Sequence, residues 1–176
     1  MAPSRRWGYH AFEPRWAELL VAEAGITPGT LVVDVGAGTG ELIGPLLEAG
    51  ARVIAVEAHP HRATVLRQRF GRSVIVVQAD AANLRLPRRP YRVVANPPFA
   101  ITTPLLRRLL QPGSRLVGAD LVLQEQAARR WAGPDAPAWR RWARYYQPSL
   151  GRPVPPHAFR PAPAVAARVL HIRQRT

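Results

Sequence analysis

Three acidic residues and one amide follow or close successive apolar segments of the chain. Asp34 lies in LVVDVG, Glu57 in VIAVEAH, Asp80 in VIVVQAD and Asn96 in YRVVANPP. Because the carboxyl ends of parallel strands meet at one edge of a sheet, these four side chains are expected to converge. A carboxylate at the end of the second strand suits ribose hydroxyls, and one at the end of the third suits an adenine amino group.

A glycine-rich turn follows the first of these strands. Gly36, Gly38 and Gly40 are spaced Gly-x-Gly-x-Gly, which differs from the Gly-x-Gly-x-x-Gly pattern of dinucleotide-binding folds. Glycines between a strand and a helix permit a tight turn and a close approach of a ligand to the helix N-terminus. The pattern predicts a nucleotide-type site, in which Asp34 orients the loop or meets an ammonium group.

The stretch Asn96-Pro97-Pro98-Phe99 is an unusual way to leave a strand. Two prolines remove two backbone donors and keep the chain extended, so nearby carbonyls lack sheet partners. The Asn96 side-chain oxygen and the Pro97 carbonyl are then available to accept hydrogen bonds from an amine. Phe99 offers a face on which an extruded base can stack. We therefore predict that Asn96, Pro97 and Phe99 form the catalytic group.

Buried-type strands alternate with helical stretches along most of the chain, which predicts an α/β fold with a mostly parallel sheet and helices on both faces. Strands are expected at 31–35, 51–59, 72–80, 91–98, 114–124 and 164–173. Helices are expected at 14–25, 39–50, 61–70, 103–113, 125–133 and 137–146, with an irregular loop after the last. We expect one domain over 1–176: a basic N-terminal lid or arm (1–13), a cofactor-binding core (14–132) and a Pro/Arg-rich substrate-side segment with the last strand (133–176).

The charge balance favours a polyanionic partner. The chain has 25 basic and 11 acidic residues, a formal charge of +14, and no acid follows Asp135. The absence of cysteine excludes disulfides and Cys-ligated zinc, and the five histidines show no metal-ligand spacing, so no metal is expected. No segment reads as a membrane span or a secretory signal, so we expect a cytoplasmic protein and no membrane partner.

The motifs as a set resemble a known family. DVGAGTG, VEAHP, QADA and NPPF, in this order, are similar to those of S-adenosylmethionine-dependent enzymes that methylate exocyclic amines, notably adenine N6. DLVLQEQAARR and FRPAPAVAARVLHI further resemble the rRNA adenine dimethylase group. That group contains the erythromycin-resistance (Erm) enzymes, which act on 23S rRNA, and the ribosome-assembly dimethyltransferases, which act on small-subunit rRNA. The resemblance covers nearly the whole chain.

The resemblance implies a Rossmann-like class I methyltransferase that binds S-adenosyl-L-methionine. It places the methionine part of the cofactor on the loop of Gly36 and Gly38, the ribose on Glu57, and the adenine on Asp80 and Ala81. Asn96 is implied to touch both the cofactor and the target amine. A family Gln-Asn-Phe segment that closes over the cofactor falls on Gly8-Tyr9-His10, so side-chain contacts differ here, and backbone contacts from Tyr9 or Ala11 are expected instead.

The resemblance also suggests how RNA is bound. The chain is similar to short actinobacterial Erm-type members that lack the helical C-terminal domain, so RNA is expected to contact the methyltransferase domain itself. Phe159 is implied to face the base opposite Phe99, with a core aromatic as the alternative. Arginines among aromatics suit phosphate contacts and base stacking; the candidates are Arg107, Arg108, Arg140, Arg141 and Arg144. The alternative for the segment around 139–146 is an amphipathic helix that buries Trp139, Trp142 and Tyr146.

These observations predict a monomeric rRNA (adenine-N6)-methyltransferase that acts on 23S rRNA or its precursor and confers macrolide-lincosamide-streptogramin resistance. Two alternatives stay open from the sequence. One is an adenine N6-methyltransferase that acts on small-subunit rRNA or DNA. The other is an RNA-binding module that keeps the fold without catalysis, which the intact Asn-Pro-Pro-Phe stretch disfavours.

Overall fold

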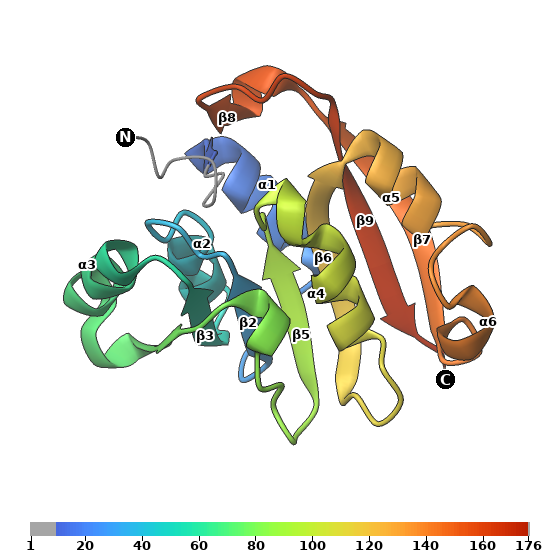
Figure 1. Ribbon diagram of the computed structural model, residues 1–176. Coiled ribbons are helices and arrows are strands. Elements are labelled where there is room, and N and C mark those ends of the chain that lie inside the picture. Colours follow the sequence, from blue (N-terminus) through green and yellow to red (C-terminus); the bar gives the residue numbers. More distant parts are fainter. Residues whose placement is uncertain (1–9, 176) are drawn as a thin grey trace.

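A mixed sheet runs through the centre of the molecule (Figure 1). The computed structural model describes residues 10–175 of the chain, so Tyr9 and most of the N-terminal arm lie outside the described residues. Within this range the sheet has seven strands in the order β4-β3-β2-β5-β6-β9-β7. Strands β2 to β6 are parallel to one another, and β9 is antiparallel to both β6 and β7. Their bounds are β2 (Leu31–Val35), β3 (Arg52–Glu57), β4 (Val74–Gln78), β5 (Tyr91–Ala95), β6 (Leu116–Gln124), β7 (Tyr146–Val154) and β9 (Ala167–Gln174).

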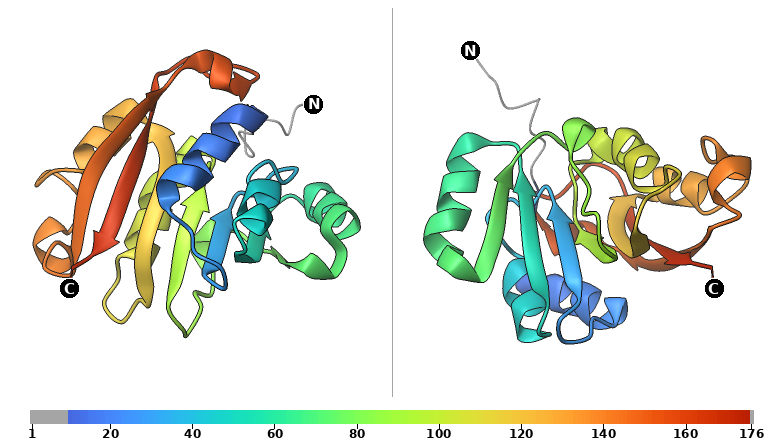
Figure 2. Two further views of the ribbon diagram at one scale, coloured as in Figure 1. Left: turned by 180° about the vertical axis from the view of Figure 1, so that it is seen from behind. Right: turned by 90° about the horizontal axis from the view of Figure 1, so that it is seen from below.

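Helices cover both faces of this sheet, which confirms the predicted fold class (Figures 1 and 2). One face packs against α1 (Pro14–Ala24), α2 (Ile43–Glu48) and α3 (Pro60–Phe70), and the other against α4 (Thr102–Leu109), α5 (Glu125–Trp131) and α6 (Trp139–Trp142). Alternate residues of β2 supply the two cores, because successive side chains of a strand point to opposite faces. Val32 thus packs on the α1 side, and Val33 on the α4 side.

Prolines explain where several elements begin or end relative to the predicted ranges. Pro14 and Pro60 occupy the first positions of α1 and α3, where a missing backbone donor costs nothing. The predicted helix at 39–50 is reduced to α2, since Pro45 is tolerated only within a first turn. Strand β5 ends at Ala95, immediately before Asn96 and the two prolines.

The C-terminal segment differs from the sequence prediction at two places. The expected irregular loop contains β7, which pairs with β9 at the edge of the sheet, and its register shifts between Leu150 and Pro153. An edge strand tolerates proline because one side needs no ladder hydrogen bonds. The expected helix at 137–146 is only the single turn α6, whose Trp142 is buried and donates its indole N–H to the Pro137 carbonyl at 2.9 Å.

A two-stranded ribbon joins the segment before α1 to the segment before β9. β1 (Ala11–Phe12) pairs antiparallel with β8 (Phe159–Arg160), so Ala11 lies opposite Arg160. The rings of Phe12 and Phe159 pack with centroids 5.3 Å apart, and both are buried. This pairing carries the residues that precede α1 to the edge of the sheet where the catalytic group is predicted.

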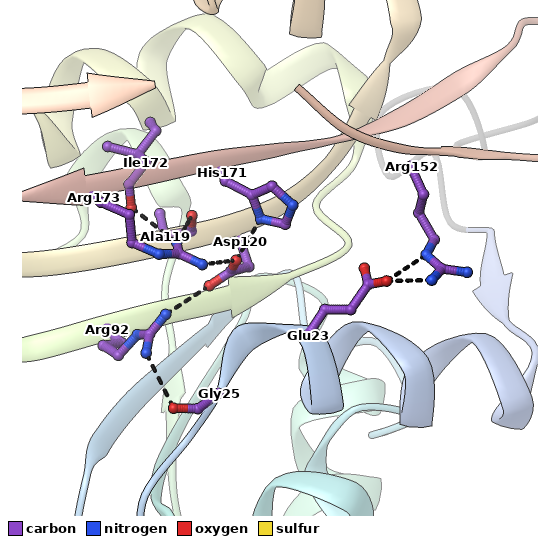
Figure 3. A network of polar contacts seen from close by, with 9 residues as sticks. All are labelled: Glu23, Gly25, Arg92, Ala119, Asp120, Arg152, His171, Ile172 and Arg173. Atoms are coloured by element: carbon purple, nitrogen blue, oxygen red, sulfur yellow. Dashed lines mark hydrogen bonds and ion pairs between the residues drawn. The ribbon is translucent and has the colours of Figure 1, made fainter. Parts of the chain in front are cut away.

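A buried ion network holds β5, β6 and β9 together (Figure 3). Asp120 of β6 is fully buried and accepts hydrogen bonds from His171 Nδ1 at 2.7 Å, Arg173 at 2.6 Å and Arg92 at 3.1 Å. Arg92 also donates to the Gly25 carbonyl at the end of α1. The network lies in the middle of the sheet, where it ties three strands and one helix together.

Candidate active site

The carboxyl ends of β2, β3, β4 and β5 bring together the groups that the sequence singled out. Two adjoining depressions there share Gly36, Glu57 and Pro98. One is also lined by Asp80 and Ala81, and the other by Asn96 and Pro97, with further contributions from His10 and Phe99. Asp34 lies within β2, one residue before its end. The strand order thus brings Glu57, Asp80 and Asn96 to these depressions, whereas Asp34 is buried and lines neither of them.

The glycine loop packs directly against the Asn-Pro-Pro stretch. Gly36 has a φ of 75°, and a Cβ there would lie 2.6 Å from the Pro98 ring, so only glycine fits. The backbone N–H groups of Gly36 and Ala37 donate to the Val56 carbonyl at 2.8 and 3.1 Å. These contacts place the glycine loop, the end of β3 and the residues after β5 in one rigid unit.

Glu57 anchors the glycine loop from β3. Its carboxylate is buried, and it accepts hydrogen bonds from the backbone N–H of Gly38 at 2.8 Å and of His59 at 2.8 Å. Arg62 of α3 donates a third bond at 3.1 Å and lines both depressions. Arg62 was not predicted from the sequence, because a single arginine within an arginine-rich helix gives no signal.

Asp34 is a buried acid for which neither carboxylate oxygen has a hydrogen-bond partner among residues 10–175. Only 1% of it is exposed. Burial raises the pKa of Asp34 well above its usual range, and the charges of Glu41 and Glu57 raise it further. Burial therefore favours the neutral form of this carboxyl, and a cation placed next to it would favour the charged form.

We expect Asp34→Asn to stabilise the ligand-free protein and weaken its binding of S-adenosylmethionine. A raised folded-state pKa means that the wild type loses stability as the pH rises above the ordinary value of 3.8, whereas the amide of the variant stays neutral. At neutral pH the Tm should rise by roughly 3 °C or more. Cofactor affinity should fall at least about tenfold, since a charge-assisted bond is lost.

Thermal melts and calorimetry at several pH values test this pair of effects. Wild-type binding should also release a proton, which calorimetry in buffers of different ionisation enthalpy detects. A lower Tm together with unchanged cofactor affinity would show that the Asp34 carboxylate serves the fold alone.

The Asn96 side chain is oriented by the backbone of the segment that precedes α1. Its Nδ2 donates to the His10 carbonyl at 3.1 Å. Because the amide nitrogen is used in this bond, Oδ1 is the atom left to accept from a ligand. Among residues 10–175 no hydrogen bond to the buried Pro97 carbonyl is found, while the Phe99 carbonyl accepts from Thr102 Oγ1 at 2.9 Å.

The His10 ring lies between the two phenylalanines predicted to flank a base. It is near-parallel to Phe99, with centroids 6.2 Å apart, and meets the edge of Phe159 at 6.4 Å. Its Nδ1 lies 2.7 Å from the Pro161 carbonyl. Phe159 is 2% exposed and belongs to a core cluster, so it reaches a base only if its surroundings move. The sequence signalled that His10 departs from the family pattern, but not these contacts.

The predicted adenine-side residues differ in exposure. Asp80 is exposed and directly precedes the short turn η3 (Ala81–Asn83), whereas Ala81 is buried. Both line the depression beside Val56 and Ile101. An apolar floor with an acid at its rim is compatible with a nucleobase that presents an amino group.

The predicted RNA-contacting arginines fall into two groups. Arg107 and Arg108 lie in the last turn of α4, and Arg107 is exposed. Arg140, Arg141 and Arg144 are all exposed near α6, whereas Trp142 and Tyr146 are buried and Trp139 is partly buried. The aromatic side chains of this segment therefore serve mainly as core, and Tyr145, which is 51% exposed, is the ring left at the surface.

The residues of the site fit S-adenosylmethionine. This cofactor is a nucleoside that carries two positive charges, on its sulfur and on its amino group. The depressions offer the Glu57 carboxylate at the end of β3, Asp80 after β4 and the backbone of Gly36, while Asp34 lies buried near the end of β2. No cluster of three or more potential metal ligands occurs among residues 10–175.

Sheet order, glycine loop and acidic strand ends together define a class I S-adenosylmethionine-dependent methyltransferase. The chain belongs to the ribosomal RNA adenine dimethylase family, whose model matches residues 13–176. Members of this family use S-adenosyl-L-methionine, in agreement with the prediction from the motifs.

The curated relatives carry three kinds of name. The chain is 36% identical over 146 residues to an rRNA adenine N-6-methyltransferase of Corynebacterium diphtheriae, covering 81% of this chain and 57% of that protein. It is 36% identical over 148 residues to the mycinamicin-resistance protein MyrB of Micromonospora griseorubida, covering 82% and 47%. It is also 36% identical over 163 residues to the ribosomal RNA small subunit methyltransferase A of Anaeromyxobacter dehalogenans, covering 81% and 57%.

Solved structures confirm the fold. The 23S rRNA methyltransferase ErmE has a TM-score of 0.80 at 25% identity, covering 93% of this chain and 69% of that one. A dimethyladenosine transferase from Plasmodium falciparum has a TM-score of 0.81 at 21% identity, covering 95% and 64%. The chain spans 57% of the length of the first curated relatives. Across residues 10–175, none of the helices has the length and apolar character needed to cross a membrane.

Proposed function

We propose that this chain transfers a methyl group from S-adenosylmethionine to the N6 amine of an adenine in 23S rRNA. The proposal rests on the geometry of the Asn96–Phe99 stretch. Pro98 in this stretch packs against Gly36 of the glycine loop, and Asn96 Nδ2 donates a hydrogen bond to the His10 carbonyl. That arrangement leaves an amide oxygen and a proline carbonyl beside the site for a sulfonium nucleoside. It suits an acceptor that has two hydrogens to donate.

The cofactor is held by groups on three strands. The backbone at Gly36 and Gly38 would contact its methionine part, and Asp34 its ammonium group. Glu57 would accept from the ribose hydroxyls: a carboxylate has about four acceptor positions, and three are used by Gly38, His59 and Arg62. Asp80 and Ala81 would hold the adenine. When bound, the cofactor supplies an electrophilic methyl group on a positively charged sulfur.

The chain's own contribution to the reaction is to position the amine. The lone pair of an adenine N6 amine is delocalised into the ring, so the free amine is a poor nucleophile. Asn96 Oδ1 and the Pro97 carbonyl would accept the two N6 hydrogens, which favours a pyramidal nitrogen and stabilises the positive charge that develops on it. No strong base is needed, because the nitrogen becomes acidic as the new bond forms.

We expect Phe99→Ala to slow turnover by roughly 10- to 100-fold, since stacking of a base on an aromatic ring contributes about 1–3 kcal/mol. Phe99 is partly exposed beside Asn96 and would support the extruded base. Single-turnover methyl transfer is the measurement, with calorimetric binding of S-adenosylmethionine as the check that the pocket is intact. Phe99→Tyr keeps the ring and should retain most activity; equal losses in both variants would argue against stacking.

One solved neighbour, which is named as a 23S rRNA methyltransferase, supports 23S rRNA as the target. One curated relative is named as a mycinamicin-resistance protein, which supports the resistance phenotype, and another is named as an rRNA adenine N-6-methyltransferase, without a subunit. Methylation of this kind would confer macrolide-lincosamide-streptogramin resistance. Small-subunit rRNA is the competing target, because other relatives are named for it.

Mapping methylated adenines in both rRNAs from cells with and without the protein tests the choice of target. New N6-methyladenine in 23S rRNA, with reduced macrolide susceptibility, is the expected result. New methylation confined to small-subunit rRNA would replace the proposed target with the competing one. A protein that binds RNA without measurable affinity for S-adenosylmethionine would instead be a non-catalytic module.

A further inference from the structure

A cleft at the opposite end of the sheet from Asn96 is lined by arginines from three parts of the chain. It lies between the segment before β5, the end of α4 and the loop before β6, at the lower edge of the sheet in Figure 1. Its charged lining residues are Arg85, Arg88, Arg108 and Arg115, and no acidic residue of the described chain lines it. Gln111 and Ser114 add neutral polar groups.

The positive charge of this cleft is not balanced within the described residues. Between Asp80 and Asp120 the sequence has no acid but seven arginines, of which Arg92 is paired with Asp120. The ion pairs found among residues 10–175 involve none of the other six. Like charges gathered in one cleft repel each other, and an anion in the cleft relieves that repulsion.

The frame of the cleft is fixed by packing. Arg108 Nε donates to the Leu84 carbonyl at 3.0 Å, which ties the segment before β5 to the end of α4. Leu84, Leu109 and Leu116, each next in sequence to an arginine that lines the cleft, are buried in one core cluster. Arg85, Arg88 and Arg115 line the open side of the cleft, so their guanidinium groups can meet a ligand in solution. A rigid frame with accessible arginine forks is suited to phosphate oxygens.

We propose that this cleft binds backbone phosphates of the substrate RNA, several nucleotides away from the methylated adenine. α4 begins just after Phe99 and ends at the cleft, so the two sites are joined by eight residues of helix, or about 12 Å. Arg107 in the last turn of that helix is exposed beside the path. The inference rests on the proposed function for the identity of the RNA, but phosphate binding by the cleft is measurable without methyl transfer.

The test compares two double variants that remove the same charge. Arg85→Ala/Arg88→Ala alters the cleft. Arg67→Ala/Arg72→Ala is the control and removes two exposed arginines, one in the last turn of α3 and one in the turn between α3 and the edge strand β4. Each is titrated at several salt concentrations with an RNA hairpin whose loop contains unpaired adenines. KM for RNA, kcat and the Kd for S-adenosylmethionine are then measured for each.

The cleft variant should weaken hairpin binding and raise KM for RNA about tenfold relative to the control variant, with kcat and cofactor Kd unchanged. The slope of log Kd against log salt should fall by about 0.7–0.9 for each lost phosphate contact. Arg85→Lys/Arg88→Lys should restore most of the affinity. Equal weakening in both double variants, or no weakening in either, would overturn the proposal. If the wild type binds the hairpin but methylates no RNA, the proposed function fails while the cleft is still judged by its binding data.

Discussion

Asn96→Ala is expected to lower kcat for methyl transfer by roughly 10²- to 10³-fold while the affinity for RNA changes little. The variant keeps the Pro97 carbonyl but removes the second acceptor of the amine hydrogens. It also removes the bond to the His10 carbonyl, which is 3.1 Å from Nδ2. The loss should therefore appear in the chemical step, which single-turnover transfer from labelled S-adenosylmethionine measures separately from binding.

The chain offers a matched control, since Asn83 is its other asparagine and is exposed in the turn after β4. Asn83→Ala deletes the same atoms away from Pro97 and should leave kcat unchanged. If Asn96→Ala kept near-normal turnover, the amide oxygen would have no part in holding the amine. Backbone carbonyls alone would then have to accept the amine hydrogens.

Asp120→Asn is expected to destabilise the fold by about 3 kcal/mol, the loss typical of a buried ion pair from which one partner is removed. Asp120 is fully buried, and its replacement leaves Arg92 and Arg173 facing a neutral group across β6 (Figure 3). Burial by itself raises the pKa of Asp120, but the hydrogen bonds of His171 and Arg173 and the nearby arginine charges outweigh it and lower the pKa overall.

The pH dependence of this effect follows from that lowered pKa. A carboxyl whose folded-state pKa is depressed stabilises the fold above its unfolded value and loses this contribution as the pH falls through the folded value. The difference between wild type and Asp120→Asn should thus be complete at neutral pH and shrink below the ordinary Asp pKa of 3.8. Urea melts at several pH values measure it.

A second acid drawn in Figure 3 supplies the control. Glu23 pairs with Arg152 at 2.7 Å, with both side chains partly exposed. Glu23→Gln should cost less than about 1 kcal/mol, because exposed ion pairs contribute little. If the two variants lost comparable free energy of unfolding, the Asp120 network would contribute no more stability than a surface ion pair.

The sequence predicted the parts of this fold that local patterns determine. Continuous Val, Ile and Leu runs indicated the parallel strands, although the edge strand β4 is largely exposed. The parallel arrangement brought Glu57, Asp80 and Asn96 to one edge. Strand β7 was missed because its prolines are tolerated only through pairing with β9, a partner that local sequence does not reveal.

The contacts that complete the site could not be predicted from the sequence either, because they join residues that are far apart along the chain. The bond between Asn96 and the His10 carbonyl joins residues 86 positions apart, and the ribbon of β1 and β8 pairs Ala11 with Arg160. Neither leaves a mark in composition or periodicity. Tertiary packing also decided the aromatic segment near α6, where Trp142 and Tyr146 turned inward and the arginines outward.

Methyl transfer to the N6 amine of adenine is tested most directly by identifying the nucleoside that receives the methyl group. The protein is incubated with methyl-labelled S-adenosylmethionine and deproteinised 23S rRNA, and the RNA is digested to nucleosides and separated. Label is expected in N6-methyladenosine or N6,N6-dimethyladenosine, with almost none when Asn96→Ala replaces the wild type. Label in any other nucleoside, or undiminished label with Asn96→Ala, would contradict it.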